Sequence, residues 1–171
     1  MIKQLLRWLG IALAGLATAL LLALVVAYGM SERVRQRQWP VPGATVVVPT
    51  DAASIEEGRR LAIVRGCFAG CHGKEAAGVV MFDDPLIARL VAPNLTSAVR
   101  KYSGVELAAI IRAGVRPDGR STLVMPAEVF ATLTDADLGR ILAFLHSLPL
   151  ADGPGPGIRL GPLGRVGLAV G

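Results

Sequence analysis

From Trp8 to Ser31 the chain has no charged residue, and the stretch LGIALAGLATALLLALVVAYGM fills residues 9–30. A helix of this length crosses a hydrocarbon layer of about 30 Å, because each helical residue rises about 1.5 Å. We therefore expect a transmembrane helix over 9–30 that serves as an uncleaved signal anchor, after a cytoplasmic segment 1–8. The alternative is a signal peptide cleaved near Ala27 or Gly29, although the apolar region of such peptides is typically only about 7 to 15 residues long.

Basic residues lie on both sides of this apolar run. Lys3 and Arg7 precede it, and Arg33, Arg35 and Arg37 follow it. Read alone, the distribution of positive charge slightly favours a cytoplasmic location for the rest of the chain.

The net charge of +5 does not indicate a nucleic-acid partner. Residues 50–150 hold 11 basic and 11 acidic side chains, which cancel. The surplus positive charge flanks the apolar run and lies near the C-terminus, where it forms no groove that could follow a phosphate backbone.

The remaining chain divides into three parts. Residues 31–50 contain Pro40, Pro42 and Pro49, which predict an extended, semi-rigid juxtamembrane spacer. Residues 51–150 are long enough for one small domain. Residues 151–171 form a Gly- and Pro-rich tail that is too interrupted for a helix; it either lies against the domain or a partner, or is a disordered end.

Three helices are predicted inside the domain. Each begins with a hydroxyl residue followed three positions later by a carboxylate, the pattern of an N-terminal cap. The three pairs are Ser54 with Glu57, Ser103 with Glu106, and Thr134 with Asp137. Because alternating apolar patterns are nearly absent, we predict an all-α domain with long loops. Its apolar core is thin, and a domain of that kind usually needs a disulfide, metal or cofactor.

The segment RGCFAGCHG contains both cysteines of the chain, Cys67 and Cys71, followed directly by His72. A metal site, a disulfide, a redox dithiol and covalent haem attachment are all compatible with these residue types. A structural zinc site needs about four protein ligands. It is disfavoured because the chain has only one other histidine, His146, which lies near the end of the last predicted helix.

Several motifs surround this segment in a fixed order. EEGRRLAIVRGC runs into Cys67, and it is followed by APNL at 92–95, YSGVELAAIIRAGVRPDGR at 102–120, VMP at 124–126, and a closing helix ending LAFLHSLP. Together they resemble the mono-haem class I cytochromes c, especially the membrane-anchored ones associated with dehydrogenases or oxidases. The resemblance covers residues 54–149. It implies one covalently attached haem c and an all-α class I cytochrome c domain over 51–150.

The resemblance assigns roles to individual residues. It implies that Cys67 and Cys71 attach the haem, that His72 and Met125 are the two axial ligands of the iron, and that the Pro93 carbonyl orients His72. The alternatives to Met125 as the distal ligand are Met81 and His146. Arg112 and Arg120 are candidate partners of the haem propionates. Gly58 and Phe144 match the small and large residues at which the terminal helices of the family cross.

One feature departs from the family pattern. Three residues separate Cys67 from Cys71, where the family usually has two. Cys71 and His72 remain adjacent, and Gly70 can adopt backbone angles closed to other residues. The longer spacing puts attachment through Cys67 in question, so a single-thioether product stays an alternative.

The resemblance implies an electron carrier, not an enzyme. It would relay single electrons between a dehydrogenase or other respiratory donor and a terminal acceptor. Because this haem attachment takes place outside the cytoplasm, the haem domain is expected on the periplasmic side of a bacterial inner membrane, against the charge distribution around the apolar run. The other hypotheses are a haem-based gas-sensing subunit and a haem-free anchored scaffold with a Cys67–Cys71 disulfide.

Overall fold

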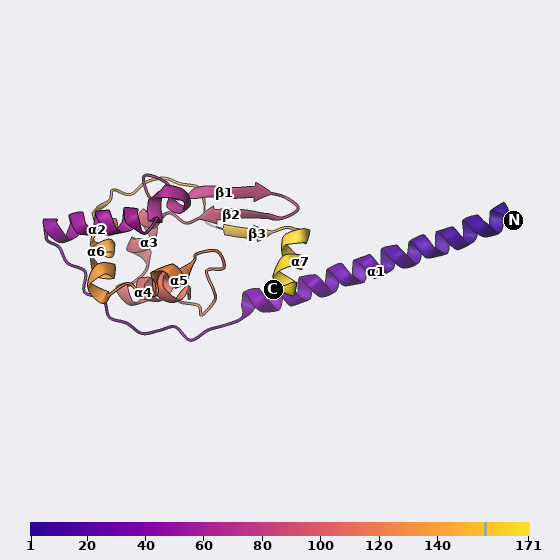
Figure 1. Ribbon diagram of the computed structural model, residues 1–171, viewed down its shortest axis with the longest axis horizontal. Coiled ribbons are helices and arrows are strands. Elements are labelled where there is room, and N and C mark those ends of the chain that lie inside the picture. Colours follow the sequence, from indigo (N-terminus) through magenta and orange to yellow (C-terminus); the bar gives the residue numbers. More distant parts are fainter. Residues whose placement is uncertain (156) are drawn as a thin grey trace.

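The first element is a long helix that stands away from the rest of the chain (Figure 1). The structure is a computed structural model and describes residues 1–155 and 157–171. Helix α1 (Ile2–Gln36) contains the predicted span, and an 18-residue window of it has a mean hydropathy of 2.6. Among the described helices it alone is long and apolar enough to cross a membrane. By itself, this finding fits either a signal sequence or an anchor.

The domain is mostly helical, as expected. Its helices are α2 (Ala52–Val64), η1 (Cys67–His72), α3 (Leu95–Lys101), α4 (Gly104–Ala113), α5 (Ala127–Phe130) and α6 (Asp135–Ser147). The caps predicted at Ser103 and Thr134 are present, and Ser103 forms a full capping box with Glu106. The cap predicted at Ser54 is wrong by three residues. The N-cap of α2 is Asp51, whose side chain accepts a hydrogen bond from the Ser54 amide.

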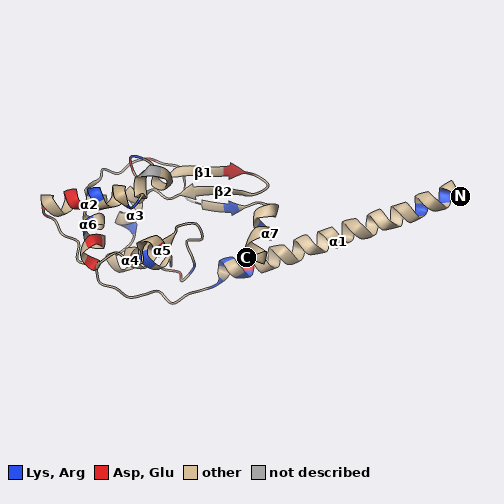
Figure 2. Cartoon of the chain, viewed as in Figure 1, with Lys and Arg blue, Asp and Glu red and all other residues tan. Residues whose placement is uncertain are grey.

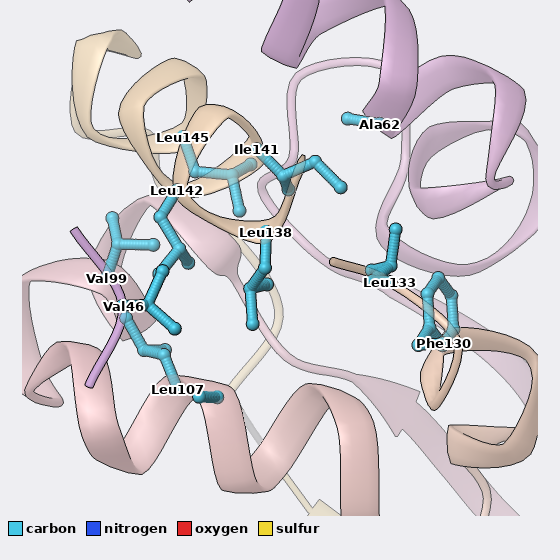
Figure 3. Packing of buried hydrophobic residues seen from close by; sticks show 11 residues of the cluster. Val46, Ala62, Val99, Leu107, Phe130, Leu133, Leu138, Ile141, Leu142 and Leu145 are labelled. Atoms are coloured by element: carbon cyan, nitrogen blue, oxygen red, sulfur yellow. The ribbon is translucent and has the colours of Figure 1, made fainter. Parts of the chain in front are cut away.

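The core is built around α6 (Figure 3). This helix turns four buried side chains inward: Leu138, Ile141, Leu142 and Leu145. The remaining core side chains come from helices α2 to α5 and from the segments beside them, and include Ala62, Val99, Leu107, Phe130 and Leu133. Burying each large aliphatic side chain contributes roughly 1.5–3 kcal/mol, so α6 carries much of the stability of this small domain.

Helices α2 and α6 cross at Gly58. A Cβ atom at this position would lie 1.8 Å from the carbonyl oxygen of Arg140, so only glycine allows the two backbones to meet. The small residue expected here is therefore in place, but it contacts the backbone of α6. The ring of Phe144 packs instead edge-on against Phe68, with ring centroids 5.8 Å apart.

The prediction of an all-α domain missed a small antiparallel sheet. Its strands are β1 (Val79–Asp84), β2 (Ala88–Ala92) and β3 (Gly157–Leu160), with β2 in the centre. The strand period is broken in β1 by a register shift between Val80 and Phe82, and most of that strand is exposed on both faces. An alternating pattern cannot survive such a bulge, which is why no strand signal is visible in the sequence.

The tail is ordered against the domain and against α1. After β3, helix α7 (Pro162–Val170) packs on the end of α1, so the expectation that the tail was too interrupted for a helix is wrong. Pro162 stands at the first helical position, where its missing N–H costs nothing. Gly164 permits close packing, since a Cβ there would lie 2.0 Å from the Ile87 carbonyl oxygen. Pro156, inside the predicted tail, lies outside the described residues.

The predicted spacer also differs from an isolated extended segment. Helix α1 continues to Gln36, and the following chain runs along the domain until α2 (Figure 1). The Trp39 amide donates to the Gly119 carbonyl over 2.7 Å, and Val46 is part of the core. Residues 37–50 thus hold the domain close to the end of α1.

Candidate haem-attachment site

The two cysteines lie on a single π-helical turn, η1, formed by CFAGCH. A π-helical turn closes a hydrogen bond from residue i to i+5, one residue more than an α-helical turn. The extra residue between Cys67 and Cys71 is therefore taken up within the turn itself. Gly66 before it (φ 80°) and Gly73 after it (φ 75°) have left-handed backbones, which end the turn on both sides at little steric cost.

His72, at the end of this turn, is buried and held by one hydrogen bond. Its side chain is 9% exposed, and its Nδ1 lies 2.8 Å from the carbonyl oxygen of Pro93. A carbonyl can only accept, so Nδ1 carries the proton and Nε2 keeps its lone pair. Burial lowers the pKa of His72, and the hydrogen bond to Pro93 opposes that shift less strongly. The ring is thus oriented as a neutral ligand with Nε2 available to a metal.

The β1–β2 hairpin explains how residues 72 and 93 meet. Val79 pairs with Ala92 at the base of the hairpin, which closes the intervening chain into a loop. Gly78 then passes so close that a Cβ on it would lie 2.6 Å from the Ala92 carbonyl oxygen. The Gly78 amide also donates to the His72 carbonyl over 2.9 Å. These contacts bring the Pro93 carbonyl to the imidazole.

Met125 reaches the edge of the core from a loop with a constrained backbone. It packs against the same hydrophobic cluster as Cys67 and Phe68. Before it, Leu123 has a left-handed φ of 66°, and the Val124 amide donates to the Thr122 carbonyl over 2.9 Å, which makes a γ-turn. A second three-residue turn follows, in which the Ala127 amide donates to the Met125 carbonyl over 2.8 Å. The backbone of the methionine is therefore fixed on both sides.

The other candidate distal ligands are placed differently. Met81 lies on β1 and is 41% exposed, and His146 is exposed in the last turn of α6. Neither is among the residues that form the core cluster or pack against it, whereas Cys67 and Met125 pack against it.

The cysteine thiols are free and partly buried. Burial, with a smaller effect of the neighbouring Cys71, raises the pKa of Cys67 to about 11. A reactive thiol is a thiolate near neutral pH, so the raised pKa of Cys67 disfavours this thiol as a redox nucleophile. The described residues also contain no cluster of three or more His, Cys, Asp or Glu side chains that would hold a metal ion.

Comparison with known proteins decides between the remaining interpretations. The sequence profile described as cytochrome c matches residues 55–149, more than half of the chain. The chain belongs to the cytochrome c family. This is a family of electron carriers, and the match runs from α2 to the end of α6.

Curated relatives of this cytochrome c are components of dehydrogenases. It is 31% identical to a nicotinate dehydrogenase subunit of Pseudomonas putida over 104 residues, which cover 56% of this chain and 9% of that protein. It is 29% identical to the cytochrome c subunits of the quinone alcohol dehydrogenases of Gluconacetobacter polyoxogenes and Komagataeibacter europaeus, over 107 residues, 57% of this chain and 23% of each relative. The chain therefore spans less than a quarter of the length of these relatives.

The residues of this cytochrome c fit the haem that the family implies. Two free thiols lie on one turn, a neutral imidazole with an available Nε2 follows them, and a thioether lies at the edge of the same core. Soft and imidazole donors of this kind suit haem iron. Arg112 adds an unused donor: its Nε is buried and has no hydrogen-bond partner in the part of the chain that the structure describes.

Both candidate propionate partners already contact carboxylates within the protein. Arg112, in the last turn of α4, donates from Nη1 to Asp135 over 2.6 Å. Arg120 lies in a loop beside Gln38, and its Nε is 3.3 Å from Asp118. Their role toward a haem stays a prediction.

Three supports of the site are not among the residues predicted from the sequence. Phe68, between the cysteines, joins the π-helical turn to α6 through Phe144. Asn94 caps α3 and donates to the Ala151 carbonyl over 2.6 Å, which joins the tail to the segment that carries Pro93. Leu123 forms the γ-turn before Met125. An Asn preceding a helix was a readable cap signal, whereas the other two depend on contacts that no local pattern reveals.

Proposed function

We propose that this protein is a membrane-anchored c-type cytochrome that relays single electrons between a dehydrogenase or other respiratory donor and a terminal acceptor. The bound haem would supply the one-electron exchange between ferric and ferrous iron. The protein's part is to attach the group, orient its ligands and exclude water. A role as a subunit of a larger dehydrogenase is supported by the names of its relatives.

The hydrogen bond between His72 and Pro93 is the observation that carries the proposal. It selects the tautomer in which Nε2 is the free ligand atom, and it holds the ring where a metal-bound histidine needs its second partner. Met125 is proposed as the other axial ligand because it packs against the same hydrophobic core as Cys67, and because both neighbouring turns hold its backbone. Two strong ligands would leave the iron no open position, which favours electron transfer over gas binding.

Attachment through both cysteines is supported by the π-helical turn. Since the turn absorbs the additional residue, Cys67 and Cys71 remain on one local element immediately before His72. We therefore favour two thioether bonds. Arg112 is proposed to bind a haem propionate through its unpartnered Nε, and Arg120 to assist from the neighbouring loop.

Retention of the N-terminal helix is supported by the packing of the tail. Cleavage after Gly29 would remove Tyr28, and cleavage after Ala27 or Gly29 would leave Ser31 and Glu32 in the first turn of a shortened helix, where helix ends fray. The buried Arg165 guanidinium would then be held less firmly by its partners, and a buried guanidinium with incomplete pairing is costly. With α1 as an anchor, the haem domain would lie on the periplasmic side of the inner membrane, where the haem is attached.

The test is an intact mass of the detergent-purified protein, produced together with cytochrome maturation machinery, combined with a reduced pyridine haemochrome spectrum. We expect one haem retained under denaturing conditions, a two-thioether spectrum and the mass of the whole chain. A shifted spectrum would mean that one cysteine is unused. A colourless protein would overturn the cytochrome proposal, and a mass lacking the first residues would overturn the anchor alone.

A further inference from the structure

Helix α7 has the reverse of the polarity expected for a helix in water. Its exposed residues include Leu163, Val166, Gly167 and Val170, which are spaced three and four apart and so form one face. Its one charged residue, Arg165, is only 8% exposed and points to the opposite side. Leu163 and Val170, in contrast, are 58% and 81% exposed.

Arg165 fixes this helix to one level of α1. Its Nη1 donates to Glu32 over 2.7 Å and to Ser31 over 3.2 Å, and its Nη2 donates to the Tyr28 hydroxyl over 3.3 Å. Its guanidinium also stacks on the Tyr28 ring, 4.0 Å from the centroid. These three residues stand where the apolar stretch of α1 ends and the charged one begins.

The tip of the β1–β2 hairpin extends the same apolar surface. The amides of Gly161 and Leu163 donate to the carbonyls of Ile87 and Leu86, each over 2.9 Å, and so join the tip to the start of α7. The side chains of Leu86 and Ile87 are exposed. In Figure 1 the hairpin tip and α7 both lie at the end of the domain from which α1 leaves.

We propose that α7 and the tip of the β1–β2 hairpin rest on the lipid bilayer. The apolar face, defined by Leu86, Ile87, Leu163, Val166 and Val170, would enter the interface, and the ion pair of Arg165 with Glu32 would hold α7 at that depth. The haem domain would then have one fixed orientation on the membrane instead of swinging on its anchor. This inference rests on α1 being the membrane anchor of the proposed function.

Two observations favour lipid as the occupant. Helix α7 contacts α1 at the level where the apolar stretch of α1 ends, so its apolar face lies next to the proposed membrane span. Arg33 and Arg37 are exposed near the end of α1, and Figure 2 marks basic residues in blue where α1 meets the domain. An apolar face bordered by arginines is the composition of a helix that lies in the interface and attracts anionic head groups.

The test measures membrane depth by electron paramagnetic resonance on the full-length holoprotein in vesicles of phosphatidylethanolamine and phosphatidylglycerol. Single cysteines for a spin label replace Val166, Leu163 and Leu86 in separate variants. Val47, which is 79% exposed and lies near α6, provides the matched control, and Leu16 in the middle of α1 reports whether the anchor is inserted. Thioether-bound Cys67 and Cys71 do not react, and the unsubstituted protein gives the background. The visible haem spectrum of each variant checks that it has folded.

We expect labels at positions 163, 166 and 86 to collide with molecular oxygen more than with a water-soluble nickel complex. At these positions the ratio of oxygen accessibility to nickel accessibility should be several-fold higher than at position 47. If these labels match Val47 while Leu16 is in lipid, the inference is overturned and the anchor stands. If Leu16 is also accessible to nickel, the anchor itself fails, and the inference with it. Labels shielded from both reagents would overturn lipid in favour of a second copy or a partner protein.

Discussion

Met125 shows how one side chain depends on backbone geometry outside its own position. A positive φ at a non-glycine residue such as Leu123 costs of order 1–3 kcal/mol, and it persists only where the surroundings enforce it. Here the strained residue lies two positions before the proposed iron ligand. The strain holds the loop so that the thioether stays at the edge of the core.

Replacing Met125 by Ala should lower the reduction potential by on the order of 100 mV, within the range of about 0.8 V that axial ligands control. It should also let carbon monoxide bind the ferrous protein, because one iron position becomes open. Potentiometry and a carbon monoxide difference spectrum measure both effects. Met81→Ala is the matched control, since Met81 is exposed on β1, and it should change neither. The reverse result for the two variants would assign the ligand to Met81.

Gly58 determines whether the terminal helices can meet. Gly58→Ala should destabilise the domain by about 3 kcal/mol, because the added methyl group overlaps the Arg140 carbonyl. The expectation is opposite in sign to the ordinary benefit of Ala over Gly in a helix. Denaturant unfolding monitored by the haem absorption tests it. Gly43→Ala, where nothing lies within 4 Å of the new methyl group, should leave the midpoint nearly unchanged.

At the scale of elements, the π-helical turn and the β1–β2 hairpin both position residues of the proposed haem site. The turn absorbs one residue between the cysteines, and the hairpin closes the chain between His72 and Pro93. In this chain the turn keeps both cysteines directly before His72, and the hairpin keeps Pro93 beside it. The site therefore depends less on an exact spacing of residues than a motif would suggest.

Deleting Gly70 tests this account of the turn. With two residues left between the cysteines, we expect an α-helical turn, two thioether bonds and an unchanged pyridine haemochrome spectrum. Gly70 is exposed and a methyl group on it would contact nothing within 4 Å, so its removal costs no packing. Loss of one thioether bond in the shortened protein would mean that the π-helical turn is required for attachment and is not merely an accommodation.

At the scale of the whole molecule, the tail connects the domain to α1. Sheet, tail helix and α1 are joined in one series of contacts, from β2 through β3 to α7 and α1. Asn94 and Thr96 join the start of the tail to the segment that carries Pro93. The haem site and the end of α1 are thus connected by ordered structure on the tail side and by residues 37–50 on the other.

The contact between α7 and α1 should weaken only in acid. Glu32 faces Arg165 of α7, together with Gln36 and Arg35 of its own helix. The hydrogen bond from Arg165, followed by that from Gln36, lowers its pKa from 4.5 to about 2. A lowered folded-state pKa adds stability above pH 4.5, and that stability is lost as the pH falls toward 2. Docking of α7 should therefore be complete at neutral pH and loosen between these values.

The mobility of a spin label at Val166 measures this loosening. Glu32→Gln removes the titrating group but keeps a hydrogen-bond acceptor, so its label mobility should no longer change with pH in that window. An identical pH response in the two proteins would assign the loosening to another group.

The sequence by itself determined the apolar helix, the capped helices α4 and α6, the family and the candidate ligands. These follow from local patterns: composition over one span, hydroxyl and carboxylate pairs at fixed spacing, and motifs in a fixed order. Only the tertiary structure decided the sheet, the π-helical turn and helix α7. A bulge in β1 hides the strand period, and the glycines of α7 lower its helix propensity until packing against Ile87 and α1 stabilises it. Their stability comes from contacts between residues far apart in the chain, which a local pattern does not contain.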